Sequence, residues 1–348
     1  MTKIEFYTGS SPTARRRVLL PCALLITALW MGSLPVFAQT SYSPNVDQIY
    51  PTNVYFGDTH LHTNLSIDAV DTYNPMGKGL SPDDAYRFAR GAVVTAHNGM
   101  KFRRQRPLDF LVIADHAENI GLLPALLADD PLLMTTEQGR ELRARYESAK
   151  GSNDALLKLF FEIYRDYNFF GEQIKDKAFR RSVWNTITTN ADQYNEPGKF
   201  TAFIGYEWSS FNYNLHRVVL FKDDAKLTRA FLPYSFYDSA APEALWAYLA
   251  KYEQTTGGGA LAIPHNGNLS EGQMFLPQDS EGKPATAGYA KNRARWEPLY
   301  EATQIKGDSE THSSLSPADE FADYETFTFR RETSRRQYEY ARSALKPP

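Results

Sequence analysis

Two histidines separated by a single residue are the feature of this sequence that most directly suggests chemistry. His60 and His62 flank Leu61 after a short, largely apolar stretch, residues 54–58. If that stretch is a buried strand, both imidazoles can turn to one side at its end, because side chains repeat every second residue along an extended segment. Imidazole is the commonest side-chain ligand for metals. The pair therefore predicts part of a metal site.

Three further histidines stand beside predicted strands. The chain contains seven histidines in all. Each of the three adjoins a short apolar run: His116 follows residues 109–114, His216 precedes 218–221 and His265 follows 260–263. Strand ends are thus their common location, whereas the polar, helix-rich stretches hold almost no histidine. Because these rings share that location, we expect them to lie near His60 and His62. A larger set of imidazoles favours a transition metal.

A carboxylate ends another predicted strand. Glu207 follows the apolar residues Ile204, Gly205 and Tyr206. Each of its two oxygens can bind one cation, so Glu207 is a candidate bridge between two metal ions. Paired ions at close range activate a water molecule and stabilise both the attacking and the leaving oxygen of a phosphoryl group.

The elements that must position these residues alternate between strands and helices. Helical patterns fall at residues 81–97, 153–170, 175–194 and 242–254, and the first opens with the capping sequence Ser81-Pro82-Asp83-Asp84. Strand candidates fall at residues 54–57, 110–114, 200–206, 217–221, 260–264 and 300–305. This alternation predicts a one-domain α/β fold with a mostly parallel sheet.

The same alternation predicts where the candidate residues meet. In closed parallel barrels the active site lies at the carboxyl ends of the strands. The residues that would fall there are His60, His62, Asp115, His116, Glu207 and His265.

The composition limits the classes of molecule that the protein is expected to bind. The chain has 348 residues and a formal charge of −3, so it lacks the basic balance of a nucleic-acid-binding protein. Its single cysteine, Cys22, lies in the N-terminal segment, which excludes cysteine chemistry and disulfides from the rest of the chain. We expect a small-molecule partner.

The N-terminal segment has the pattern of a secretory signal. Three arginines at positions 15–17 precede an apolar run over residues 18–34, and Val36 and Ala38 supply small residues at signal-peptidase spacing. We predict a signal peptide over residues 1–38, a lead-in over 39–53, and a periplasmic or secreted protein. The alternative is a retained membrane anchor. The run is short for a spanning helix and contains Pro21 and Gly32, which argues against a stable anchor.

The motifs resemble, in kind and order, those of the PHP superfamily, named for polymerase and histidinol phosphatase. They are His60-Leu61-His62-Thr63, Asp115-His116, Glu207 and Pro264-His265. Within that superfamily, residues 57–63 and 206–210 look closer to the secreted bacterial domain-of-unknown-function family 3604. The resemblance covers about residues 54–324. It implies a distorted seven-stranded (β/α) barrel, two or three ions of zinc, manganese or iron, and phosphoesterase-type hydrolysis by metal-bound hydroxide.

By position, the resemblance implies a role for each candidate. His60 and His62 hold one metal ion, His116 and His265 contribute to others, Glu207 bridges, and His216 matches the family's histidine after the bridging glutamate. Asp68 resembles an acidic position that orients a ligating histidine. Asp115 either does the same or binds metal itself. Arg217 is a candidate phosphate contact, since a guanidinium can bind two phosphate oxygens at once.

The sequence also departs from the superfamily. The barrel of PHP proteins ends with an Asp-x-His motif on a last strand, and we find no such strand here. We therefore expect a barrel domain over residues 54–326 that is incomplete at its C-terminal end, followed by a tail outside the family at 327–348. The chain is then a truncated form, a degenerate copy, or a protein whose gap is filled by Asp308, Glu310 and His312.

Three classes of function follow. The first is a periplasmic or secreted metal-dependent hydrolase of phosphate esters, with Glu207, Asp115 and Arg217 as its catalytic candidates. The second is a truncated or degenerate protein that binds metal or ligand without turnover. The third is an amide or lactone hydrolase of the metal-barrel type. The sequence does not choose the substrate, the metal or the oligomeric state.

Overall fold

The computed structural model describes residues 52–66, 68–69, 79–165, 176–210, 213–327 and 334–345. The predicted signal peptide and nearly all of the lead-in lie outside these residues. The chain divides into two compact units, Met1–Val54 and Tyr55–Pro348, and the elements described below belong to the second.

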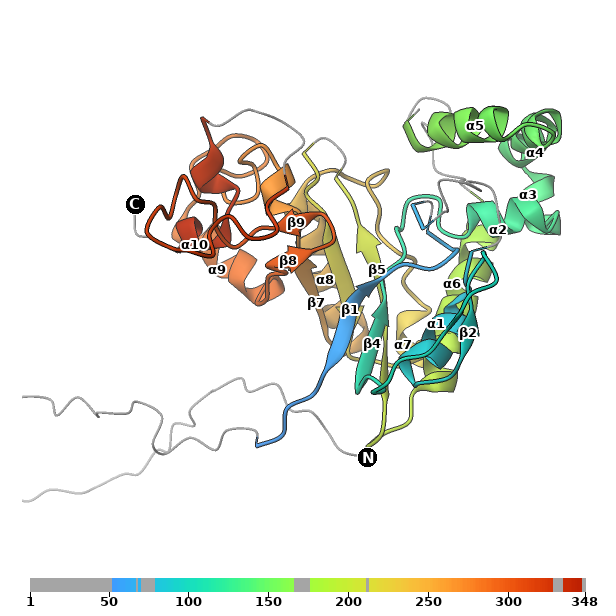
Figure 1. Ribbon diagram of the computed structural model, residues 1–348, viewed down its shortest axis with the longest axis horizontal. Coiled ribbons are helices and arrows are strands. Elements are labelled where there is room, and N and C mark those ends of the chain that lie inside the picture. The colour runs from blue at the N-terminus through green and yellow to red at the C-terminus, as the bar shows by residue number, and fades with distance from the viewer. Residues whose placement is uncertain are drawn as a thin grey trace, which may run out of the picture. The chain divides into compact units, whose positions relative to one another are not determined.

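The described residues contain one five-stranded sheet, which curls into a half-barrel (Figure 1). Its strands lie in the order β1 (Gly57–Leu61), β4 (Phe110–Ile113), β5 (Thr201–Trp208), β6 (Arg217–Phe221) and β7 (Ala260–Pro264). Five of the six predicted strands are thus confirmed as neighbours in one sheet. The protein has the α/β architecture that the alternation predicts.

One strand runs against the prediction of a mostly parallel sheet. The neighbours β1, β4 and β5 are parallel, but β6 is antiparallel to both β5 and β7. The cause is the connection over residues 209–216, because a parallel crossover needs a dozen or more residues. As a result the start of β6 lies at the same edge of the sheet as the ends of its neighbours.

The first strand is displaced along the chain from its predicted position. The prediction was residues 54–57, whereas β1 begins at Gly57, and the side chains of Val54, Tyr55 and Phe56 are exposed. A side chain at position 57 would collide with the ring of Phe110 on β4, so only glycine lets the two strands approach there.

Three helices cover one face of the sheet. They are α1 (Pro82–Ala89), α6 (Lys177–Tyr194) and α8 (Pro242–Thr256). Together with that face they bury the main core, whose largest fully buried side chains include Trp184, Tyr206, Trp208, Phe221 and Trp246. Each buried apolar side chain of this size contributes roughly 1.5–3 kcal/mol. This core fixes the strands whose ends carry the candidate ligands.

The predicted helix at residues 81–97 starts correctly and ends early. The Ser81 hydroxyl accepts from the Asp84 N–H at 3.2 Å, and the Asp84 carboxylate accepts from the Ser81 N–H at 3.1 Å, which is a reciprocal cap. The helix stops at Ala89, and Gly91 adopts φ +85°. A hairpin of β2 (Val94–Thr95) and β3 (Lys101–Phe102) follows.

A helical segment is inserted between β4 and β5. It comprises α2 (Leu122–Leu127), α3 (Pro131–Thr135), α4 (Glu137–Ala149) and α5 (Asn153–Arg165), and it forms a second apolar core with Phe179 of α6.

No helix of the described residues has the length and apolar character needed to span a membrane.

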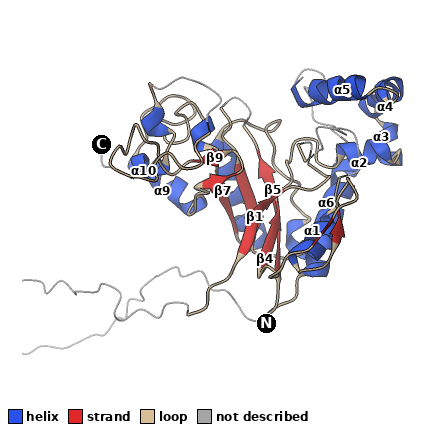
Figure 2. Ribbon diagram, viewed as in Figure 1, coloured by secondary structure: helices blue, strands red, loops and turns tan. Residues whose placement is uncertain are grey.

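The part of the chain after β7 is mostly loop (Figure 2). It contains η1 (Gly267–Leu269), α9 (Ala287–Trp296), η2 (Arg336–Tyr338), α10 (Ala341–Ala344) and a hairpin of β8 (Thr303–Gln304) with β9 (Gly307–Asp308). The predicted strand at residues 300–305 is therefore reduced to β8. It pairs with β9 instead of extending the sheet.

Candidate metal centre

Strand alternation places the candidate ligands on the sheet face opposite α1, α6 and α8. On β5, Tyr206 and Trp208 point into the main core, so Glu207 between them points to the other face. That face carries a small apolar layer of Val112, Ala114, Val218 and Ile263. The candidate residues continue this layer at the edge where the strands end.

Glu207 lies at the centre of the site and is fully buried. Its Oε2 atom lies 3.1 Å from His60 Nε2 and 2.7 Å from His62 Nε2. Its Oε1 atom lies 2.6 Å from His216 Nδ1 and 2.9 Å from His265 Nε2.

A fifth histidine completes the cluster. His116 Nδ1 lies 3.8 Å from Glu207 Oε1. The imidazoles also contact one another, with ring centroids 4.1 Å apart for His60 and His265 and 4.9 Å apart for His62 and His116. The structure thus brings together all five predicted histidines around the predicted bridging carboxylate.

Two groups of possible metal ligands share Glu207. One is His60, Glu207 and His265, and the other is His62, His116 and Glu207. Within each group the ligand atoms lie within 4.8 Å of one another. Buried clusters of histidine and glutamate are therefore present that could bind a metal ion.

The histidines of the cluster differ in the direction of their pKa shifts. Burial alone would lower the pKa of His60, but Glu207 and Glu301 raise it to about 9. Burial lowers the pKa of His216 to about 4 against the attraction of Glu207, and the charges of His116 and Lys306 act in the same direction. The surrounding histidines hold the pKa of Glu207 well below its usual range, although burial alone would raise it. Glu207 is thus a buried anion that is compensated by imidazole protons.

The donor set fits a transition metal ion. Imidazole nitrogen and carboxylate oxygen are ligands that suit zinc, manganese and iron. The His62 Nε2 atom approaches Glu207 closely, yet it makes no well-aligned hydrogen bond among the described residues. Nδ1 of the fully buried His265 also has no partner there. His60, His216 and His265 do hydrogen-bond to Glu207, so the crowding of imidazoles around one carboxylate, together with these unpartnered nitrogens, is the arrangement that a metal ion could occupy.

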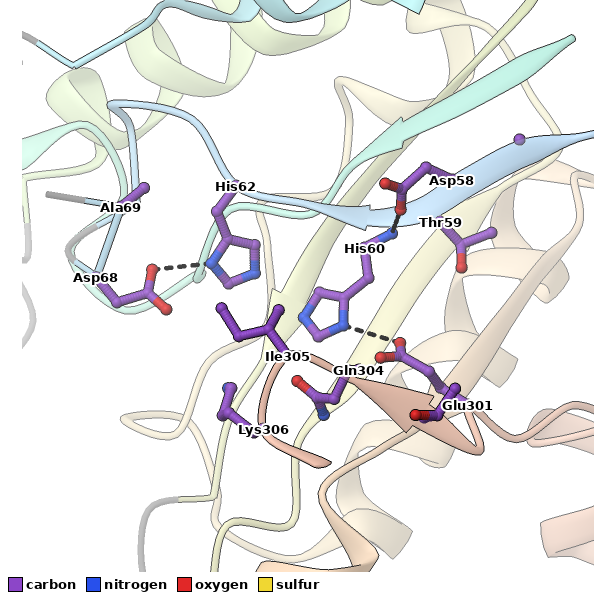
Figure 3. Close-up of a pocket in the computed structure, with 12 residues that line it drawn as sticks. Asp58, Thr59, His60, His62, Asp68, Ala69, Glu301, Gln304, Ile305 and Lys306 are labelled. Atoms are coloured by element: carbon purple, nitrogen blue, oxygen red, sulfur yellow. Dashed lines mark hydrogen bonds and ion pairs between the residues drawn. The ribbon is translucent and has the colours of Figure 1, made fainter. Parts of the chain in front are cut away.

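Asp68, predicted to orient a ligating histidine, contacts two of the candidate histidines. Its Oδ1 atom lies 2.8 Å from His62 Nδ1, and its Oδ2 atom lies 3.3 Å from His116 Nε2 (Figure 3 shows the first contact). The Ser66 hydroxyl donates to Asp68 at 2.7 Å and accepts from the His116 N–H at 3.1 Å. Asp68 thereby links the histidines of two strands.

The structure does not bring Asp115 into either ligand group. Its Oδ1 atom accepts from the Thr63 N–H at 2.5 Å, and its Oδ2 atom accepts from the Thr63 hydroxyl at 2.7 Å. Burial raises the pKa of Asp115 to about 6 despite these bonds. Asp115 therefore fastens the loop after His62 to the end of β4.

Arg217 also lies away from the site, against the expectation of a phosphate contact. It is the first residue of β6 and directly follows His216, so the two side chains point to opposite faces. There its Nε atom donates to Glu297 Oε1 at 2.9 Å, and its guanidinium lies over the ring of Trp208 at 5.7 Å. Both charged groups are buried.

Two acidic residues of the site were missed by the sequence analysis. Glu301 Oε2 lies 2.8 Å from His60 Nδ1 (Figure 3). Glu118 is buried near His116, with Oε2 3.8 Å from Nδ1, and burial raises its pKa to about 7. The signals were weak: Glu118 stands two residues after a predicted ligand, and Glu301 lies in a predicted strand.

The three residues considered as a replacement for the last motif are engaged locally. Asp308 Oδ2 accepts from the N–H groups of Glu310 and Thr311. Glu310 pairs with Arg342 at 2.5 Å, and His312 Nδ1 lies 2.9 Å from the Ser314 hydroxyl. None of the three belongs to either ligand group in the described residues.

A pocket of about 560 Å³ opens beside the cluster. His60, His62 and Asp68 line one side, and Glu301 with the β8–β9 hairpin lines the other, as Figure 3 shows. His60 and His62 are the partly exposed members of the cluster, since their side chains retain 12% and 13% exposure. A small molecule in the pocket would therefore meet the cluster at these two rings.

The family of the chain is established by a match to a family model. The chain belongs to the family described as protein of unknown function (DUF3604), whose model matches residues 50–347. The resemblance to this family that the motifs indicated is thus confirmed. The matched range includes residues 327–347, where the sequence analysis expected a tail outside the family. No curated protein and no solved structure matched the chain.

Proposed function

We propose that this member of the DUF3604 family is a metal-dependent hydrolase of phosphate esters, with a PHP-type barrel as its core. The observation that carries the proposal is the arrangement of five histidines around the buried Glu207 beside an open pocket. A carboxylate in the interior needs only one compensating charge, so five imidazoles are better explained as ligands.

The two ligand groups indicate which residues would hold the ions. His60, Glu207 and His265 would hold one, and His62, His116 and Glu207 would hold another, with zinc, manganese or iron as candidates. His216 stands beside Glu207 as a further donor. When bound, such ions supply an activated water molecule and offset negative charge on a phosphoryl group.

The chain's own residues prepare the site. Glu301 accepts a hydrogen bond from His60 Nδ1 and Asp68 accepts one from His62 Nδ1, which leaves the Nε2 atom of each ring directed at Glu207. Glu207 holds its negative charge at neutral pH, as its lowered pKa requires. The pocket positions a substrate against the exposed edges of His60 and His62.

The proposal includes the location of the protein. The N-terminal pattern supports secretion to the periplasm or beyond, where the substrate would be a small organic phosphate. Sequencing the N-terminus of protein purified from a secreting host tests this, and Gln39 as the first residue is the expected result. An N-terminus at Met1 on membrane-associated protein would contradict it.

Elemental analysis and hydrolysis assays on the same preparation test the activity. We expect at least two equivalents of transition metal per chain, and hydrolysis of p-nitrophenyl phosphate that a chelator abolishes. Bound metal without hydrolysis of phosphate, amide or lactone substrates would favour a binding protein without turnover. Bound metal with hydrolysis of amides or lactones alone would assign the site to that class. Less than half an equivalent in folded, metal-supplied protein would overturn the proposal.

A further inference from the structure

Because Arg217 pairs with Glu297 in the core, a cationic side chain that could contact an anion in the pocket has to come from elsewhere. Among the described residues that line it, Lys306 is the one with a positively charged side chain, apart from the protonated histidines. Lys306 lies between β8 and β9 at the turn of the hairpin, opposite His62 and Asp68.

The ammonium group of Lys306 is available for a ligand. No carboxylate of the described residues lies within ion-pair distance of it, although the same structure contains many paired lysines and arginines. It lines the same pocket as His60 and His62, the two partly exposed rings of the cluster. A partly buried cation without a carboxylate partner is suited to an anion that enters from solvent.

The backbone around Lys306 is held in place. Its carbonyl accepts from Asn268 Nδ2 at 2.9 Å, and Gly307 adopts φ +97° against the backbone of Phe327, where a side chain would not fit. The hairpin is therefore a fixed wall of the pocket.

The hairpin is also tied to the cluster itself. Gln304 Nε2 donates to Asn266 Oδ1 at 2.7 Å, and Asn266 directly follows His265. Glu301, which precedes the hairpin, accepts a hydrogen bond from His60. The contacts to His60 and to Asn266, the residue after His265, thus fix the position of the hairpin that carries Lys306 relative to the histidines.

We propose that Lys306 binds the phosphoryl group of an organic phosphate monoester and positions it against His60 and His62, an inference that rests on the proposed function. Ile305 beside it is 97% exposed and lines the same pocket, so it would contact the organic part of the ester. A lysine ammonium offers a compact charge with three donors, which suits a phosphate dianion.

The test is calorimetric titration of inorganic phosphate into the full processed chain, with and without bound metal, alongside hydrolysis of p-nitrophenyl phosphate. We expect Lys306→Gln to weaken phosphate binding by about ten- to a hundredfold, as the loss of a charge-assisted hydrogen bond does. The KM for p-nitrophenyl phosphate should rise by a similar factor while metal content is unchanged. Lys306→Arg should restore most of the binding.

Lys291→Gln is the matched control, because Lys291 is an exposed lysine on α9 outside the pocket. Equal phosphate affinity in Lys306→Gln and in this control, with metal bound in both, would overturn the role of Lys306 and leave the proposed function standing. Phosphate binding that depends on Lys306 in protein that takes up no metal would support the anion site and overturn the proposed function.

Discussion

Nδ1 of His60 lies 2.8 Å from Oε2 of Glu301, a residue 241 positions further along the chain. The segment after α9 thus supplies an acidic partner to a histidine on the first strand. The contact fixes which ring nitrogen of His60 faces Glu207. It also makes residues near the C-terminal end of the chain part of the candidate metal centre.

Removing this partner should weaken metal binding. We expect Glu301→Ala to reduce the affinity of one metal ion by about ten- to a hundredfold, because the acidic partner of a ligating histidine sets its orientation and basicity. Competition with a chromophoric chelator measures the change. Glu281→Ala, which removes an exposed carboxylate outside the pocket lining, is the control. Equal affinities in the two variants would show that Glu301 does not support a ligand.

Replacing the central carboxylate should affect both ligand groups. In Glu207→Gln, we expect metal content to fall below half an equivalent, because both groups lose their shared ligand. The variant should also lose about 3–5 kcal/mol of stability when metal-free, since protonated histidines stay buried without their counterion. Elemental analysis and thermal unfolding measure the two effects. Two retained equivalents of metal would contradict the bridging role.

Breaking the pair of Arg217 and Glu297 should affect stability but not metal content. Breaking a buried ion pair is costly, so we expect Glu297→Gln to lower the free energy of unfolding by about 3–5 kcal/mol while metal content stays at the wild-type value. The charges of Arg217 and Arg293 hold the pKa of Glu297 below its usual value, although burial would raise it. Its stabilisation is therefore present above the pKa of an unfolded glutamate and is lost as the pH falls. Denaturant unfolding between pH 7 and pH 3 should show a shallower acid slope in the variant.

Metal affinity should rise with pH. Despite burial, Glu207 and Glu301 raise the pKa of His60 to about 9, so at neutral pH the metal-free ring carries a proton that a metal ion must displace. The affinity should increase by up to about tenfold per pH unit for each proton released, and it should level off above about pH 9. Calorimetry in two buffers of different ionisation enthalpy measures the protons. Affinity that does not change between pH 6 and pH 8 would contradict this coupling.

The candidate ligands were predictable because their signals are local. Apolar runs mark the strands, and the polar residues at their ends must meet at one edge of the sheet. The antiparallel direction of β6 was also implicit in the length of the loop before it. The position of Arg217 directly after His216, at the start of an extended segment, already indicated that the two side chains point apart.

The contribution of the C-terminal region was not predictable in the same way. The contact between Glu301 and His60 depends on how the segment after α9 packs against β1, and no periodic pattern encodes that packing. The same holds for Lys306, whose place in the pocket follows from the position of the β8–β9 hairpin. Long-range docking, rather than local periodicity, sets these contacts.

The spread of the ligands along the chain has a consequence for the order of events in biogenesis. The donors extend from His60 to His265, and Glu301 supports the first of them. An unfolded chain holds no preformed site, and contacts this distant in sequence form late in folding. The group of His60, Glu207 and His265, with Glu301 beside it, therefore cannot assemble until a ribosome has released most of the polypeptide. Under the proposed function, the compartment in which folding finishes would decide which metal ion the centre takes up.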